Sequence, residues 1–403
     1  MSEALGGLPL AHEQAAAYCE RLGIALAEYR RRFADAPAPL LDATKDASPD
    51  YHGGLTVAKA FALAIEEAAK LHPAAEPLVA YAALLAPELI PLFLFADARQ
   101  QFGEPFASEI AGDGLDEAVA ALRAFALVDR ETIADERDPS VTTETIRLHR
   151  LVRVAAAGRR QGDALEGARR VLVNAMVAVY PRTVDNDPSV WTRARRLDAL
   201  ALDLVRSEAV PGGAETSASY LLDRLATYRY LALGAYSEAR PLFERALAMC
   251  EKALGPEHPS TATRLNNLAD LLRAQGDLAG ARPLYERALK IDEAAYGPEH
   301  SEVATDLNNL AALLRTQGDL AAARPLSERA LAIKEKALGP EHRSTATSLN
   351  NLALLLQAQG DLAGAGDLRE GARPRASLDR HEPRQPRALA SCSGRPRGRA
   401  ATP

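Results

Sequence analysis

The sequence predicts a mainly α-helical protein in which a small β-hairpin domain is followed by an α-α superhelical solenoid. Leu-Asn-Asn-Leu-Ala occurs at 265–269, 307–311 and 349–353, and Gly-Pro-Glu-His recurs at the same 42-residue step. A fixed period of this length indicates a stacked array of helical units. The chain is 47% hydrophobic but only 5% aromatic, which is typical of closely packed helices built from Ala and Leu.

Composition limits the compartment and the partners. The three cysteines, Cys19, Cys250 and Cys392, are odd in number and lack metal-ligand spacing, which suits a reducing compartment. No apolar stretch reaches membrane-spanning length, and the N-terminus lacks a signal-peptide pattern. We therefore expect a cytoplasmic protein without a membrane partner.

The charge is distributed unevenly along the chain. Residues 366–403 carry nine Arg, two Asp and two Glu, a charge of +5. Since the whole chain has a net charge of −6, the other 365 residues carry −11. An acidic body argues against nucleic acid as the main partner.

Residues 71–160 predict a winged-helix-like domain. Short helices are expected at 76–85 and 91–101, followed by an amphipathic helix at 115–127. Two strands, 128–133 and 145–148, then flank a polar turn at 134–143. The helix before this hairpin carries Arg123 as its only basic residue, too little charge for reading DNA.

Residues 161–219 predict a helical connector. Ala168, Leu172, Ala175 and Val179 form one apolar stripe, and Trp191, the only tryptophan, is expected to pack where the two halves join.

Each repeat reads as a helix–turn–helix unit. In the second unit, Leu265, Leu268, Ala269 and Leu272 form the stripe of a first helix, and Leu278, Ala281, Tyr285 and Ala288 form that of a second helix. Gly276 suits a helix end and Asp277 a helix start. We place units at 220–261, 262–303 and 304–345, with a partial fourth at 346–365. The first unit is degenerate, because Asp223 stands where Leu is expected.

This pattern resembles the tetratricopeptide repeat, position by position, and the 42-residue length with Leu-Asn-Asn-Leu-Ala resembles the kinesin-light-chain type. The resemblance implies that the first helices line a concave groove that holds a peptide or protein. Asparagine amides can hold a peptide backbone, and arginine can hold a carboxylate. The groove candidates are Asn266, Asn267, Arg273, Asn308, Asn309, Arg315, Asn350 and Asn351. In the alternative interpretation, Asn267, Asn309 and Asn351 only tie neighbouring helices together. His258, His300 and His342 are single imidazoles in separate turns, so we expect no metal site there.

A second resemblance covers residues 4–160. Gly7-Leu8-Pro9-Leu10-Ala11 is similar to the Gly-x-Pro segment of NB-ARC/STAND regulatory ATPases, and Leu148-His149-Arg150-Leu151-Val152 is similar to their Met-His-Asp motif. This resemblance implies that residues 1–70 are a helical remnant of the NB-ARC region. It also implies that Pro9 lies near adenine and that His149 approaches the ADP β-phosphate. Arg150 replaces the family's Asp. No Gly-x-x-x-x-Gly-Lys-Ser/Thr occurs, so ADP or ATP binding is expected only if a separate ATPase core is supplied.

Residues 366–403 form an Arg/Pro-rich tail that breaks the repeat. One interpretation is a disordered basic tail. The other interpretation is a frameshift. When residues 373–403 are back-translated and the codons are read one base out of frame, synonymous codon choices allow the repeat sequences GPEHPSTATSL and NLALLLRAQGDLAGARPL. We hypothesise the frameshift, which predicts a lost capping helix and self-association through the uncapped last repeat.

Together these features predict a non-enzymatic interaction scaffold with no catalytic residues, derived from a STAND-type signalling regulator. The alternative is the ADP-sensing half of a STAND switch. A DNA-binding transcription factor is a third, less favoured interpretation.

Overall fold

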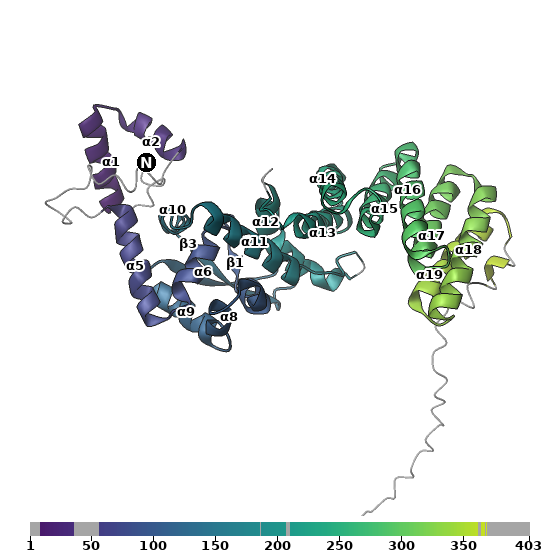
Figure 1. The fold of residues 1–403 in the computed structure, drawn as a ribbon, viewed down its shortest axis with the longest axis horizontal. Helices are drawn as coiled ribbons and strands as arrows, with labels where there is room; N and C mark the ends of the chain where they lie inside the picture. The colour runs from purple at the N-terminus through teal and green to yellow at the C-terminus, as the bar shows by residue number, and fades with distance from the viewer. Residues whose placement is uncertain are drawn as a thin grey trace, which may run out of the picture.

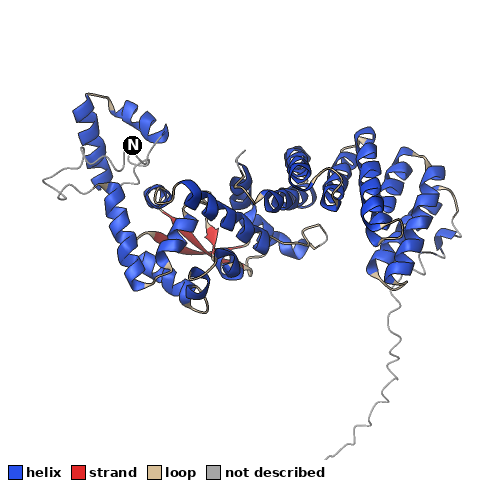
Figure 2. Ribbon diagram, viewed as in Figure 1, coloured by secondary structure: helices blue, strands red, loops and turns tan. Residues whose placement is uncertain are grey.

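The computed structural model describes residues 9–35, 56–185, 187–206, 210–361, 364–366 and 368. In this part of the chain, an N-terminal helical region leads through a small sheet to a stack of helix pairs at the other end (Figure 1). Helices dominate, and the strands are confined to one place (Figure 2).

The N-terminal helices are α1 (Pro9–Leu22) and α2 (Leu26–Asp35). Their apolar side chains form one buried cluster with the start of α5 (Val57–Leu71) and the start of α10 (Arg150–Ala157). Within the cluster, Tyr29 meets Tyr18 edge-on at 5.3 Å and stacks on Phe33 at 6.0 Å between ring centroids. The region predicted as an NB-ARC remnant is thus helical in its described residues and packs on the helix that follows the hairpin.

A three-stranded antiparallel sheet lies at the centre of the next domain. Its strands are β1 (Ile90–Pro91), β2 (Val128–Ala134) and β3 (Thr142–Leu148), in the order β1-β3-β2. Ile90 pairs with Ile146, and Val128 pairs with Leu148. The remaining elements between 75 and 124 are α6 (Ala75–Ala82), α7 (Phe93–Asp97), the 3₁₀ helix η2 (Arg99–Phe102), α8 (Phe106–Glu109) and α9 (Gly114–Ala124). A helix followed directly by a two-stranded wing is the predicted winged-helix-like arrangement.

The structure corrects three details of this domain. The helix predicted at 91–101 begins only at Phe93, because residues 90 and 91 pair with β3 and the backbone N–H of Leu92 donates to Glu144 O at 2.9 Å. The helix predicted to reach Leu127 ends at Ala124, since Ala126 has a φ of 54° and turns the chain into β2. The sheet has three strands rather than two, because the two-residue β1 is too short to show a strand pattern in the sequence.

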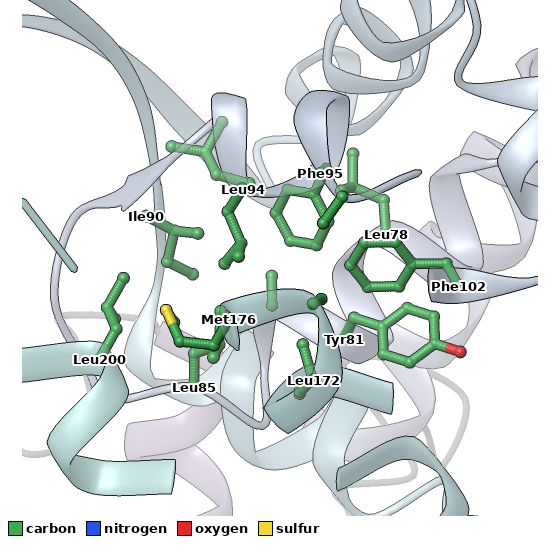
Figure 3. Close-up of a cluster of buried hydrophobic side chains, with 14 of the residues drawn as sticks. Leu78, Tyr81, Leu85, Ile90, Leu94, Phe95, Phe102, Leu172, Met176 and Leu200 are labelled. Carbon is green, nitrogen blue, oxygen red and sulfur yellow. The ribbon is translucent and has the colours of Figure 1, made fainter. Parts of the chain in front are cut away.

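One continuous core joins the sheet domain to the helices that follow. These are α11 (Gly162–Val179), the 3₁₀ helix η3 (Pro188–Val190) and α12 (Trp191–Arg206). Leu172 and Met176 of α11 face Leu94 and Phe95 in the cluster drawn in Figure 3. The predicted stripe on α11 is confirmed, since all four of its residues are buried. Trp191 is partly buried at the edge of this core, and its Nε1 donates to Val184 O at 2.9 Å.

Seven helices form the array within the described residues. We call α13 (Glu215–Leu233), α15 (Pro259–Ala274), α17 (Ser301–Gln317) and α19 (Arg343–Ala358) the first helices. The second helices are α14 (Tyr236–Leu254), α16 (Leu278–Tyr296) and α18 (Leu320–Leu338). Each second helix packs between two first helices, and neighbouring first helices also touch (Figure 1). α13 begins five residues before the predicted first unit, and its buried residues belong partly to the core of the preceding domain.

Candidate binding surface of the helical array

The same turn chemistry positions the helices from α15 to α19. Gly276, Gly318 and Gly360 have φ angles of 84–86°, which lets the chain turn after each first helix without a steric penalty. Asp277 Oδ1 then accepts a hydrogen bond from Gly280 N at 2.9 Å and caps the second helix, as predicted. His258, His300 and His342 cap the first helices, because each Nδ1 accepts from the backbone N–H two residues later at 3.1–3.2 Å. The imidazoles of the Pro-Glu-His turns therefore hold the helix starts.

The apolar stripes of the repeat are buried as predicted. Leu265, Ala269, Ala281, Tyr285 and Ala288 are each 0% exposed. A helix pair of this kind buries its stripe only by stacking on the next pair, so the 42-residue period becomes a continuous solenoid.

A family model decides what this solenoid is. The tetratricopeptide repeat model matches residues 216–294, 265–336 and 302–368. Residues 216–368 are a tetratricopeptide repeat array. Among curated proteins, no sequence matches the chain.

Solved structures similar to the chain include other tetratricopeptide proteins. BtubC (BKLC) from P. vanneervenii is 23% identical over 58% of this chain and 88% of its own, with a TM-score of 0.42. A putative kinesin light chain from Podospora anserina, with nearly identical repeats, is 28% identical over 51% of this chain and 92% of its own, with a TM-score of 0.39. A STAND protein with a tetratricopeptide repeat sensor from Pyrococcus horikoshii is 12% identical over 91% of this chain and 53% of its own, with a TM-score of 0.41.

The predicted groove asparagines fall into two groups. Three of them bridge first helices: Asn266 Nδ2 donates to Asp306 Oδ1 at 2.6 Å, Asn308 Nδ2 to Ser348 Oγ at 2.8 Å, and Asn267 Nδ2 to Asp223 Oδ1 at 2.8 Å. We considered that the second asparagine of each Asn-Asn pair ties neighbouring helices together. Asn266 and Asn308, which are the first asparagines of their pairs, also do so. The other three are Asn309 and Asn351, which are half-buried, and Asn350, which is exposed.

The two predicted groove arginines differ in their surroundings. Asp270 Oδ1 accepts hydrogen bonds from Arg273 Nη2 at 3.0 Å and from the Tyr285 hydroxyl at 2.6 Å. Burial, together with the charge of Asp270, raises the pKa of Tyr285 well above its usual value, so the hydroxyl remains a donor. Arg315 occupies the same position one unit later, yet no residue that the structure describes pairs with its guanidinium.

Two carboxyl groups are buried together between the second and third units. Asp306 of α17 is 1% exposed and Asp292 of α16 is 6% exposed. Burial raises the pKa of Asp306 to about 7, with a further contribution from Asp292, although the hydrogen bond from Asn266 lowers it. Burial and the charge of Glu302 raise the pKa of Asp292 to about 6. The pair therefore holds a proton near neutral pH, and sequence analysis missed it because neither residue lies in a motif.

The degenerate first unit contains a buried ionic cluster. Asp223, 0% exposed, accepts from Arg224 Nη2 at 2.8 Å and lies 3.6 Å from Arg264 Nη1. Asn267 supplies a further donor to the same carboxylate. The missing leucine of this unit is thus replaced by a carboxylate whose partners come from its own helix and from the next first helix.

The residues carried over from the STAND resemblance lie on two helices that share one cluster. Pro9 is the first residue of α1, and His149 is the N-cap of α10, with its Nδ1 accepting from Leu151 N at 3.3 Å. Ala11 and Leu151, two residues further along each helix, are both buried in this cluster. An open cavity of about 640 Å³ beside it is lined by Ala27, Arg30, Arg31, Phe33, Ala34 and Arg150.

Two searches of the described residues limit other functions. None of the helices in 9–35, 56–206 and 210–361 that the structure describes is long and apolar enough to cross a membrane. Within the same part of the chain, no group of three His, Cys, Asp or Glu side chains could hold a metal ion. Cys392 and the proposed frameshifted tail lie outside the described residues, apart from 366 and 368. Ala365 is buried in the apolar cluster of the array, which includes Leu352, Leu355 and Leu356 of α19, and Leu368 packs against this cluster.

Proposed function

We propose that this chain is a non-enzymatic scaffold that binds a peptide or protein along the first helices of its tetratricopeptide array. The observation that carries the proposal is a line of polar side chains on the first helices. Asn309 and Asn351 lie at the same position of consecutive units, Asn350 precedes Asn351, and Arg315 lies on the same helix as Asn309. These four side chains are at least partly accessible and take part in no hydrogen bond among the described residues. An extended peptide offers backbone groups at regular spacing, which such a repeated set of amides can bind.

The electrostatics of the winged-helix-like domain support a protein partner over nucleic acid. Arg130 pairs with Asp116 at 2.6 Å and with Glu144 at 2.9 Å, and Arg147 lies 3.4 Å from Glu131. The basic side chains of strands β2 and β3 are thus paired with carboxylates of the same domain. DNA phosphates require an excess of unpaired positive charge.

Selection from a displayed library of random linear peptides tests the proposal with the full chain. We expect enriched peptides whose affinity falls about tenfold or more when Asn350 and Asn351 are both changed to Ala, because each lost hydrogen bond weakens binding. Asn174→Ala on α11, outside the array, is the matched control and leaves affinity unchanged. Failure to enrich any peptide, or equal affinity for the Asn350/Asn351 variant, would contradict the proposal.

A second candidate is a nucleotide-dependent switch derived from a STAND regulator. The cavity lined by Arg30, Arg31 and Arg150 favours it, because guanidinium groups suit a phosphate, although Arg31 also pairs with Glu28. Pro9 and His149 would then contact ADP held mainly by a separate ATPase core. In the described residues, however, His149 Nδ1 is already used as a helix cap. This candidate predicts that the chain alone does not bind ADP in a calorimetric titration. It also predicts that ADP binding to a supplied ATPase core becomes at least tenfold tighter when the chain is present, and equal affinity would exclude it.

A further inference from the structure

The second and third units of the array differ at two positions that line a small space in the third unit. Asn308, Ala311, Ala312, Arg315, Ser327, Asn351 and Leu355 line a space between α17, α18 and α19. Its volume of about 10 Å³ is close to the minimum that holds one water-sized group. Five of the seven lining residues are the same one period earlier: Asn266, Ala269, Arg273, Asn309 and Leu313. Only Ala312 and Ser327 differ, and they stand in place of Asp270 and Tyr285.

The second unit shows what normally occupies this place. There the Asp270 carboxylate receives hydrogen bonds from Arg273 and from the Tyr285 hydroxyl. In the third unit Ala312 supplies no carboxylate, and Ser327 is too short to reach across as tyrosine does. Arg315 keeps its positive charge but has lost both partners. A half-buried guanidinium without a carboxylate is electrostatically incomplete, so this position favours an anion from outside the chain.

Asn308 does not distinguish the third unit from the second. Its Nδ2 donates to Ser348, and its Oδ1 is buried without a hydrogen-bond partner among the described residues. The equivalent Asn266 donates to Asp306 and leaves its Oδ1 buried in the same way. The difference between the two units therefore lies at the arginine.

We infer that the third unit binds an acidic side chain, Asp or Glu, of a peptide ligand, whose carboxylate pairs with the half-buried guanidinium of Arg315 as the Asp270 carboxylate pairs with that of Arg273. This inference rests on the proposed function and specifies its ligand. The carboxylate accepts hydrogen bonds from the guanidinium of Arg315. Arg273 is satisfied within the chain and does not take part.

The peptides selected in the library experiment test the inference. We expect one position to be enriched in Asp or Glu, and replacement of that residue by its amide to weaken binding about tenfold or more. The decisive variant combines Ala312→Asp with Ser327→Tyr, which restores the residues of the second unit. It should fold, because the other lining residues already accommodate them there, and it should bind the acidic peptides about tenfold more weakly. Arg315→Ala should weaken the acidic peptide but leave its amide version unaffected.

The outcomes separate this inference from the proposed function. Peptides that are selected without an acidic position, or that bind the Ala312→Asp, Ser327→Tyr double variant equally well, would overturn the inference and leave groove binding intact. A requirement for a free C-terminal carboxylate, shown by loss of binding on C-terminal amidation, would also overturn it. Failure to select any peptide would contradict both the inference and the proposed function. Circular dichroism and thermal unfolding of each variant show whether it is folded.

Discussion

The buried pair of Asp292 and Asp306 makes stability fall as the pH rises through neutrality. Both carboxyl groups have a pKa above the value of 3.8 expected in the unfolded chain. A raised folded-state pKa means that the folded chain holds its protons while the unfolded chain has released them. The stabilisation is therefore complete below about pH 4 and is lost progressively as the pH rises towards 7. Glu302 adds negative charge to the site, and His300 and Lys334 are the nearby basic groups.

The size of the effect follows from the two shifts. With pKa values of about 6 and about 7, and roughly 1.4 kcal/mol per pKa unit, the pair should lower the free energy of unfolding by on the order of 4 kcal/mol between pH 5 and pH 8. Asp306→Asn keeps the acceptor for Asn266 and can donate to Asp292. We expect this variant to lose on the order of 1 kcal/mol over the same interval, because only one carboxyl group then titrates.

Urea unfolding followed by circular dichroism at pH 5, 6, 7 and 8 measures this difference. The quantity compared is the change in unfolding free energy with pH, so any pH-independent effect of the substitution cancels. Asp129→Asn, at an exposed position on β2, is the matched control and should follow the natural chain. Parallel pH profiles for Asp306→Asn and the natural chain would refute the shared-proton interpretation.

Substitutions at three further positions test contacts within the array by thermal or urea unfolding. Asp223→Leu restores the expected repeat residue yet should destabilise the array by about 3 kcal/mol, because it leaves the buried Arg264 without a carboxylate; a gain in stability would show that the ionic cluster is dispensable. Tyr285→Phe should cost about 1 kcal/mol through the lost hydrogen bond to Asp270, and no change would mean that water replaces the hydroxyl. His300→Ala should cost about 1 kcal/mol as a lost helix cap, while His300→Asn should retain most of the stability; equal losses in both would exclude a capping role.

The architecture of the array could be predicted because its determinants are local in sequence. Leu265 and Ala269 lie on one face of one helix, and Gly276 and Asp277 define the following turn. Each of these features depends on residues within about eight positions, a range over which helical periodicity and turn preferences are informative. The winged hairpin was found for the same reason, whereas the two-residue strand β1 depends on pairing with residues more than fifty positions away.

The polar contacts of the site could not be predicted from the same patterns. Asn266 binds Asp306, forty residues away, and which of two adjacent asparagines faces the next helix depends on how far the units rotate relative to each other. The motif Leu-Asn-Asn-Leu-Ala therefore located the polar side chains of the first helices. It did not distinguish the asparagines that bridge helices from those that are accessible. A comparison of equivalent repeat positions does indicate which arginine lacks a partner. The exchanges of Asp270 for Ala312 and of Tyr285 for Ser327 are visible in the sequence and predict the unpaired Arg315.

Another set of exchanges between the units affects the order in which the nearly identical units stack. At one equivalent position the three units carry Arg264, Asp306 and Ser348, and each meets a different partner on the preceding helices: Asp223, Asn266 and Asn308. If the third unit stacked directly on the first, Asp306 would lie against Asp223 in the place of Arg264. Two buried carboxylates would then face each other with Arg224 as their arginine, instead of one carboxylate with two arginines. The apolar stripes would fit such a slipped stack almost as well as the native one, since they hardly differ between units. The variable polar residues thus act against misordered stacking of the repeats, and the same variation leaves Arg315 available for a ligand.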